Sequence, residues 1–373
     1  MSPAQGIRNY MDIWDKRDDM VVHGTDPYNA EPSPCVLADR TLTPLDAFYS
    51  RNHGPIPDLD PASWRLTVDG LVGHPLTLSL EDLRSDFSEH ALVATLQCAG
   101  NRRADLIKVR DIPGEDPWGP GAISTAHWNG VKLADVLARA ELCPEAAHIA
   151  FAAPDVSDIA DPPQPYGGSI PVAKAITGQV LLAWGMNGRP LPRAHGAPVR
   201  AIVPGWIGAR SVKWLQRVTA QAEPSDNYFQ ATAYRMLPSE ADPARTGPCA
   251  GISLGPVTLN TAILRPDDGA RLRPGLTQIA GYAYAGENRA VARVDVSLDE
   301  GGTWIQADLD EQVSPWAWQH WRTTADLGEG ETVITARAWD TAGATQPESA
   351  RHLWNPKGYA NTSWARIHVT CHS

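Results

Sequence analysis

The segment LQCAGNRR, residues 96–103, decides how the chain is interpreted, because its cysteine has the setting of a functional thiol. Cys98 directly follows an apolar run, residues 92–97, which we expect to form a strand. The alanine and glycine after it leave room for a bulky group to approach the sulfur and let the backbone turn. The segment therefore predicts an accessible cysteine at the end of a buried strand.

Positive charge lies close to this cysteine in the sequence. Arg102 and Arg103 follow it, and Lys108 and Arg110 come next. Cationic surroundings lower the pKa of a thiol and favour the thiolate, which acts as a nucleophile or as a ligand for a soft metal. The alternative is a buried, inert cysteine, because free cysteine is among the most buried residue types.

The remaining cysteines lack such surroundings, so we expect them to be inert: Cys35, Cys143, Cys249 and Cys371. The five cysteines are widely spaced, odd in number and form no CxxC pair. This pattern argues against a disulfide scaffold and favours a reducing compartment. The first thirty residues contain no apolar stretch typical of a signal peptide, so we expect a cytoplasmic protein.

Two further segments are rich in polar donors. The loop FYSRNHGPIP, residues 48–57, offers Arg51, Asn52 and His53 between glycine and proline residues, which suits recognition of an anion or a polar heterocycle. A solvated loop is an equally good interpretation of this segment alone. The second segment runs from His195 to Trp214, and we expect residues 211–218 of it to form a strand.

Alternation along that expected strand would place Ser211 and Lys213 on one face, where both could contact a phosphate. A lysine on a solvated face is the alternative, and the sequence leaves the two open.

The chain is long enough for two domains, with 43% apolar and 20% charged residues among 373. Residues 1–45 are expected to be an extended arm, and residues 46–245 a mixed α+β domain. Evenly spaced, alternating strands without helices then predict an immunoglobulin-like β-sandwich over residues 250–373. The fold class is therefore α+β with a second, all-β domain.

Charge and hydropathy exclude two kinds of partner. The formal net charge of −11 argues against a nucleic-acid binder. No run of 18 apolar residues occurs, so we expect no membrane span.

Seven segments taken together resemble the sulfite oxidase family of molybdenum–pyranopterin oxidoreductases, and in particular its haem-less, plant-type, two-domain members. They lie in the same order over residues 40–370: FYSRNHGPIP, LQCAGNRR, GAISTAHWNGVKLADVL, YGGSIP, LLAWGMNGRPLPRAHGAPVR, VPGWIGARSVKWL and WNPKGYANTSWARIHV. The resemblance implies a molybdopterin-binding catalytic domain and an immunoglobulin-like domain that carries most of a homodimer contact.

The resemblance also implies roles for individual residues. Cys98 would ligate molybdenum beside the dithiolene of the pterin. Pterin and phosphate contacts would fall on a larger set: Tyr49, Ser50, Arg51, Asn52, His53, Asp155, His195, Arg200, Ser211, Val212 and Lys213.

The implied substrate is sulfite, a small anion that fixed cations would hold. The family's substrate pocket maps onto Arg51, Arg103, Trp118, Tyr234 and Lys357. Lys357, in WNPKG, stands where the family's sulfite oxidases have arginine, so it keeps the charge but loses the bidentate fork. The retained charge still favours sulfite, and reduction of nitrate or of an S- or N-oxide by the same cofactor is the alternative.

No haem, flavin or nicotinamide motif accompanies these segments. The electrons are accordingly expected to pass to oxygen or to a separate acceptor.

Overall fold

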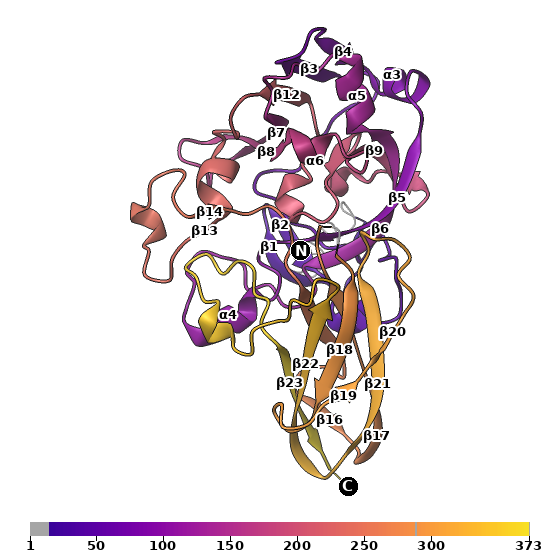
Figure 1. Cartoon of the computed structure of the whole chain (residues 1–373), viewed down its shortest axis with the longest axis vertical. Coiled ribbons are helices and arrows are strands. Elements are labelled where there is room, and N and C mark those ends of the chain that lie inside the picture. The colour runs from indigo at the N-terminus through magenta and orange to yellow at the C-terminus, as the bar shows by residue number, and fades with distance from the viewer. Residues whose placement is uncertain (1–14, 288, 373) are drawn as a thin grey trace, which may run out of the picture.

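The structure is a computed structural model that describes residues 15–287 and 289–372 (Figure 1). A mixed α+β domain forms the upper part of the molecule, and an elongated β-sandwich extends below it, with the C-terminus at its far end. Among the described residues, no helix combines the length and apolar character that crossing a membrane requires.

The first domain contains two five-stranded sheets. One has the order β10-β9-β6-β5, with β11 paired to β9, and all its pairs are antiparallel. Its strands are β5 (His90–Gln97), β6 (Ile123–Lys132), β9 (Leu181–Met186), β10 (Arg189–Pro190) and β11 (Arg200–Ile202). The other has the order β4-β3-β12-β7-β8, in which only β3 and β12 run parallel. Its strands are β3 (Leu66–Gly70), β4 (Leu76–Leu78), β7 (His148–Ser157), β8 (Gln164–Pro171) and β12 (Arg217–Gln221).

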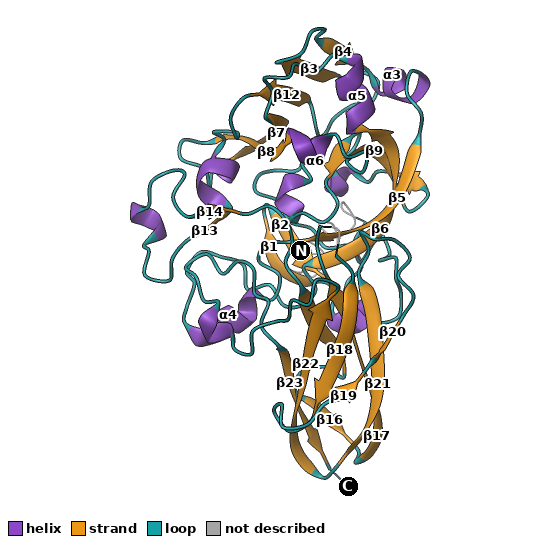
Figure 2. Ribbon diagram, in the orientation of Figure 1, coloured by secondary structure: helices purple, strands orange, loops and turns teal. Residues whose placement is uncertain are grey.

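The helices are short: some lie against these sheets, and one, Arg103–Val109, lies lower, beside the sandwich (Figure 2). They are α2 (Pro34–Leu37), α3 (Leu80–Ser85), α4 (Arg103–Val109), α5 (Leu133–Arg139) and α6 (Val172–Ala175), with 3₁₀ turns at Arg193–His195, Gly208–Arg210, Pro243–Arg245 and Ala350–His352 and a π-helical turn at Phe229–Ala233. Helix α5 forms where apolar residues recur at helical spacing: Leu133, Val136 and Leu137 are all buried against the core. Helix α3 begins with a capping box between Ser79 and Asp82.

The second domain is a sandwich of two sheets, of four and five strands. The first has the order β15-β17-β21-β20, with β15 (Asn260–Arg265), β17 (Gly275–Tyr284), β20 (Asp308–Leu309) and β21 (Gln319–Leu327). The second has the order β16-β23-β22-β18-β19, with β16 (Ala270–Leu272), β18 (Val291–Ser297), β19 (Ile305–Gln306), β22 (Gly330–Asp340) and β23 (Ala365–Cys371). Alternating apolar residues from the facing strands fill the space between them.

The two domains share packing and hydrogen bonds. Tyr282, Tyr284 and Trp318 of the sandwich belong to the same apolar cluster as the core of the first domain. A main-chain hydrogen bond joins the domains: the Thr95 amide of β5 donates to the Trp316 carbonyl, before β21, at 2.9 Å. A long C-terminal segment also returns to helix α4, where the Trp354 Nε1 donates to the Arg110 carbonyl at 2.8 Å.

The predicted α+β class and the following β-sandwich are confirmed. The expected strand over residues 211–218 is wrong: a 3₁₀ turn ends at Arg210, Trp214 has a positive φ of 51°, and β12 begins only at Arg217. The described part of the expected extended arm, residues 15–45, contains the hairpin β1 (Val21–Thr25) and β2 (Tyr28–Glu31) and helix α2. Residues 1–14 lie outside the described residues, and the domain boundaries at 45/46 and 245/250 stay predictions.

Candidate active site

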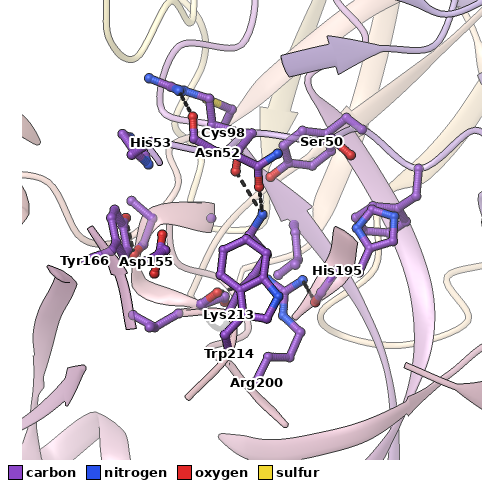
Figure 3. Close-up of a pocket in the computed structure, with 18 of the residues that line it drawn as sticks. Ser50, Asn52, His53, Cys98, Asp155, Tyr166, His195, Arg200, Lys213 and Trp214 are labelled. Carbon is purple, nitrogen blue, oxygen red and sulfur yellow. Dashed lines mark hydrogen bonds between the residues drawn. The ribbon is translucent and has the colours of Figure 1, made fainter. Parts of the chain in front are cut away.

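A cavity of about 620 Å³, including its open mouth, lies in the first domain. Loops, strand ends and 3₁₀ turns from six parts of the chain line it, so that segments far apart in sequence converge (Figure 3). The lining residues are Phe48, Tyr49, Ser50, Arg51, Asn52, His53, Leu96, Cys98, Asp155, Tyr166, His195, Arg200, Gly208, Ala209, Ser211, Val212, Lys213, Trp214 and Tyr234. This cavity therefore holds Cys98, all eleven predicted cofactor contacts and Tyr234.

Cys98 lies just beyond the end of β5 and is 6% exposed. Its amide donates to the Ala122 carbonyl at 2.9 Å, and its Sγ accepts from the Gly100 amide at 3.4 Å. A side chain at residue 100 would collide with the Arg103 guanidinium, because a Cβ there would lie 2.4 Å from Nη2. Glycine at this turn thus allows Arg103 to approach the cysteine.

The electrostatic setting of the thiol differs from the one expected from neighbouring sequence. Burial raises the pKa of Cys98, while the charges of Arg103 and Arg51 lower it less. Arg102 points away and donates to the carbonyls of Thr261 and Ser363 in the second domain. Lys108 is exposed, as is Arg110. Without a ligand the thiol is therefore protonated, and deprotonation would accompany metal binding.

Two cations on the cavity wall differ in exposure: Arg200 is buried and Lys213 is partly buried. Arg200 donates to the carbonyls of His195 and Ser211, both at 2.9 Å. Lys213 donates to the Arg51 carbonyl at 3.2 Å and to the Asn52 side-chain oxygen, and Figure 3 shows its amine directed toward these two acceptors. Burial lowers the pKa of Arg200 to about 10 and that of Lys213 well below its ordinary value. An anionic ligand would stabilise both charges.

Two polar atoms on the cavity wall have no hydrogen-bond partner within the described residues. They are the Ser50 Oγ and the Asp155 Oδ1. Burial also raises the pKa of Asp155 to about 7, against the opposing charge of Lys213. Buried polar atoms are normally satisfied, so these two atoms indicate a polar ligand in the cavity.

A third feature is an aromatic cluster around His53. The Tyr234 hydroxyl and the His53 Nε2 are 2.8 Å apart, and the Tyr166 ring stacks on the imidazole at 4.8 Å between centroids. Burial lowers the pKa of His53 well below its ordinary value and raises that of Tyr234. His53 is therefore neutral, and Tyr234 keeps its proton and can donate it in a hydrogen bond.

Three of the predicted substrate residues do not line the cavity. Trp118 is fully buried and packs edge-on against His23 at 4.6 Å. Arg103 pairs with the Glu115 Oε2 at 3.3 Å, and Lys357 pairs with the other oxygen of the same carboxylate at 2.9 Å. Their roles toward substrate stay predictions.

Charged residues outside the cavity nevertheless influence residues that line it. Arg103 also donates to the Lys357 carbonyl at 3.1 Å, which joins the C-terminal segment to the cysteine loop. The negative charge of Glu115 raises the pKa of Tyr234, whereas Arg103 lowers it. Arg51, which does line the cavity, forms an ion pair with Asp116, in which the Arg51 Nε lies 3.9 Å from the Asp116 Oδ2.

Sequence reasoning missed several functional candidates. Tyr166 is the first residue of YGGSIP, and the carboxylates Glu115 and Asp116 lie two to three residues before Trp118. The two carboxylates could have been noticed, because acidic residues are unexpected next to a pocket proposed to bind an anion. Lys16, which contacts His195, gave no signal in the sequence.

Among the described residues, no group of three or more His, Cys, Asp and Glu side chains could hold a metal ion. A metal beside Cys98 would therefore need ligands from a bound organic group as well as from the described protein.

Comparison with known proteins gives matches over both domains. The family model for the oxidoreductase molybdopterin binding domain matches residues 53–229. The family model for the Mo-co oxidoreductase dimerisation domain matches residues 254–372. The mitochondrial sulfite oxidase of Mus musculus is 41% identical over 382 residues, covering 99% of this chain and 69% of the mouse protein. The sulfite oxidase of Arabidopsis thaliana is 37% identical over 388 residues, covering 98% of each.

Among solved structures, the sulfane dehydrogenase SoxCD from Paracoccus pantotrophus superimposes with a TM-score of 0.80 at 26% sequence identity. The match covers 99% of this chain and 90% of that chain. The chain thus spans nearly the whole plant relative but only about two thirds of the mouse one.

Proposed function

Because this chain belongs to the sulfite oxidase family of molybdopterin oxidoreductases, we propose that it oxidises sulfite to sulfate with a bound molybdenum–pyranopterin cofactor. The observation that carries the proposal is the buried thiol of Cys98 in a cavity that also presents Arg51, Arg200 and Lys213. A soft ligand and several cations on the cavity wall suit a soft metal held by an anionic organic group.

The residues present fit such a cofactor. Two cations that line the cavity, Arg200 and Lys213, would bind its phosphate, and the unsatisfied Ser50 Oγ and Asp155 Oδ1 would bind polar ring atoms. The Cys98 Sγ would bind the metal. The remaining contacts that we propose are Tyr49, Arg51, Asn52, His53, His195, Ser211 and Val212.

Sulfite would be held by positive charge next to the metal. Arg51 and Tyr234 line the cavity directly, and Arg103 is close enough to lower the pKa of the Cys98 thiol. Lys357, which shares the Glu115 carboxylate with Arg103, would supply a third cation, and buried Trp118 would support the wall of the pocket. Arginine is suited to this role because its planar fork binds two oxygens of an oxyanion at once.

The overall reaction converts sulfite and water into sulfate, two protons and two electrons. The molybdenum–pterin group, when bound, supplies the oxygen transfer and accepts the electrons. The protein orients the anion and compensates its charge, and Tyr234, which stays protonated, donates a hydrogen bond to an oxyanion. We propose that the electrons leave to oxygen or to a separate acceptor protein.

The residue at position 357 bears on a second candidate substrate. The cation at position 357 is a lysine paired with Glu115, so it lacks the bidentate fork of an arginine. Reduction of nitrate or of an S- or N-oxide by the same cofactor is the corresponding alternative. Steady-state assays with sulfite and an electron acceptor, and with nitrate and a reductant, separate the two.

We further propose that the protein acts as a homodimer through its second domain, which matches the dimerisation domain of the family. Light scattering of the full chain should give twice the chain mass.

A cytoplasmic location is supported by the described cysteines, all of which are free. Fractionation of the source cells tests that location.

The decisive test of the function is metal and pterin analysis of the purified protein together with the sulfite assay. About one molybdenum per chain and sulfite-dependent reduction of an acceptor support the proposal. A protein that is folded, contains no molybdenum after expression in a cofactor-producing host, and does not oxidise sulfite would refute it.

A further inference from the structure

A buried lysine from the N-terminal segment lies directly behind the wall of the cavity. Lys16 is 7% exposed, and its Nζ is 2.7 Å from each of three acceptors. Two are the main-chain carbonyls of Leu45 and Phe48, and the third is the Nε2 of His195. His195 itself lines the cavity and is 2% exposed.

The cost of this arrangement indicates a purpose beyond packing. An ammonium group taken out of water is unfavourable unless it is compensated, and burial lowers the pKa of Lys16 to about 7. Asp46 and Asp15 oppose that shift only as nearby charges, and the hydrogen bonds of the amine go to the three acceptors above. Costly buried charges of this kind occur most often at functional sites.

The geometry decides the tautomer of His195. Burial and the charges of Lys16, Lys213 and Arg200 lower the pKa of His195 well below its ordinary value, so the ring is neutral. A neutral imidazole has one donor and one acceptor nitrogen, and an ammonium group has three donors and no acceptor. Three acceptors surround Lys16, so Nε2 accepts and the ring proton resides on Nδ1.

The ring is also held in place. Phe48 packs edge-on against it at 5.2 Å between centroids, and the His195 carbonyl accepts from Arg200. Because Lys16 occupies Nε2, Nδ1 is the ring nitrogen left to serve a ligand.

We propose that Lys16 is a positioning residue of the cofactor pocket, which fixes His195 as an Nδ1–H donor toward the pterin group and strengthens cofactor retention. Partners behind a ligating histidine commonly set its tautomer in this way. The tautomer follows from contacts within the chain, whereas the identity of the ligand rests on the function proposed above.

The tautomer is tested by nitrogen-15 NMR of the full-length protein labelled at histidine, recorded at pH 6, where Lys16 is protonated. A His195→Gln variant assigns the two ring signals. We expect a protonated Nδ1 and an unprotonated, hydrogen-bonded Nε2 in the wild type, and a mixture of tautomers in Lys16→Met and Lys16→Gln. Lys174→Met is the matched control, since Lys174 is a part-buried lysine of the same domain that lies over Trp316 at 4.6 Å.

Cofactor retention is the second readout, and it does not depend on activity. Molybdenum and oxidised pterin per chain are measured during dialysis of the holoenzyme. We expect Lys16→Met and Lys16→Gln to lose both at least threefold faster than the wild type, and Lys174→Met to match the wild type. Lys16→Gln keeps a hydrogen-bond donor, so it serves if the methionine variant does not fold.

Several outcomes would overturn the proposal. One is a wild-type His195 protonated on Nε2 and bonded to the Leu45 carbonyl, which lies close enough to raise its pKa slightly. Others are an unchanged tautomer in the Lys16 variants, or equal rates of cofactor loss. A wild-type protein that binds neither molybdenum nor pterin would refute the proposed function and the retention role together, while the spectra would still decide the tautomer.

Discussion

Lys357 contributes one charge to a cluster of five charged residues at and beside the proposed sulfite pocket. Three cations, Arg51, Arg103 and Lys357, are paired with two carboxylates, Glu115 and Asp116. Glu115 is shared between Arg103 and Lys357, so the five groups together carry one positive charge. Replacing Lys357 by alanine reduces that charge to zero, although neither of the two arginines is altered.

The size of the effect follows from this single charge. A unit charge about 7 Å from a substrate charge contributes about 2.4 kcal/mol at an effective dielectric constant of about 20. The Lys357 side chain is 24% exposed, so solvent screening reduces this to about 1–2 kcal/mol. Lys357→Ala should therefore lower kcat/KM for sulfite by roughly 5- to 30-fold.

A pair of variants separates charge from structure. Glu115→Gln raises the local charge by one unit and should raise kcat/KM, and Lys357→Ala combined with Glu115→Gln restores one positive charge and should approach the wild-type value. The assay is steady-state sulfite oxidation with an artificial acceptor at low ionic strength, where such charges are least screened. Lys108→Ala is the control, because Lys108 is an exposed cation that is likewise paired with a carboxylate, at 3.8 Å.

Two results would refute this reasoning. The first is a change of less than twofold in Lys357→Ala, which would remove Lys357 from the pocket electrostatics. The second is a double variant no better than Lys357→Ala, which would show that the lysine acts through packing instead of charge.

Three further predictions follow from the structure. Cys98→Ser should reduce kcat to below about one tenth of the wild-type value, a barrier increase above about 1.4 kcal/mol, with an unchanged circular dichroism spectrum, because a hydroxyl does not replace a soft thiolate; a larger residual kcat would disprove the ligand role. In the cofactor-free protein, burial holds the pKa of Lys16 at about 7 against an ordinary 10.5, so between these pH values the folded chain binds fewer protons than the unfolded chain. The cost of burying the charged amine is fully present below pH 7. The free energy of unfolding relative to Lys16→Met should therefore rise by up to about 1.4 kcal/mol per pH unit from pH 7 to 10. Urea melts in which this difference stays constant with pH would contradict the prediction. A chain ending at residue 245 should lack a cooperative thermal transition, because it loses Trp318 and the other sandwich residues of the shared core; a sharp calorimetric peak would count against this.

Elements whose pattern is local could be predicted from the sequence. The segment VARVDVS alternates apolar and polar residues as a strand does, and it forms strand β18, Val291–Ser297. The functional groups around Arg51 and Cys98 can also be predicted, because each set lies within a few residues of sequence. Arg51 and Cys98 line the same cavity in the structure.

Other parts could not be predicted, for physical reasons that differ between them. The alternating residues Ser211 to Trp214 satisfy a strand pattern, but Trp214 adopts a left-handed backbone conformation that no pattern of apolar residues reveals. Lys16 and His195 are 179 positions apart, and Lys357 and Glu115 are 242 apart. Such pairs are created by tertiary packing, so composition and spacing carry no record of them.

The way in which Arg102 joins the domains has a consequence for engineering. This residue follows the cysteine turn, yet its guanidinium bonds to the carbonyls of Thr261 and Ser363 in the sandwich, and its own carbonyl accepts from Asn361. A chimera that exchanged the second domain for that of a relative would therefore disturb the loop carrying the thiol, even with every cavity residue retained. Successful recombination requires that residues 99–103 and the sandwich segments around 261 and 361–363 be transferred as one block, so that the two modules are inherited together.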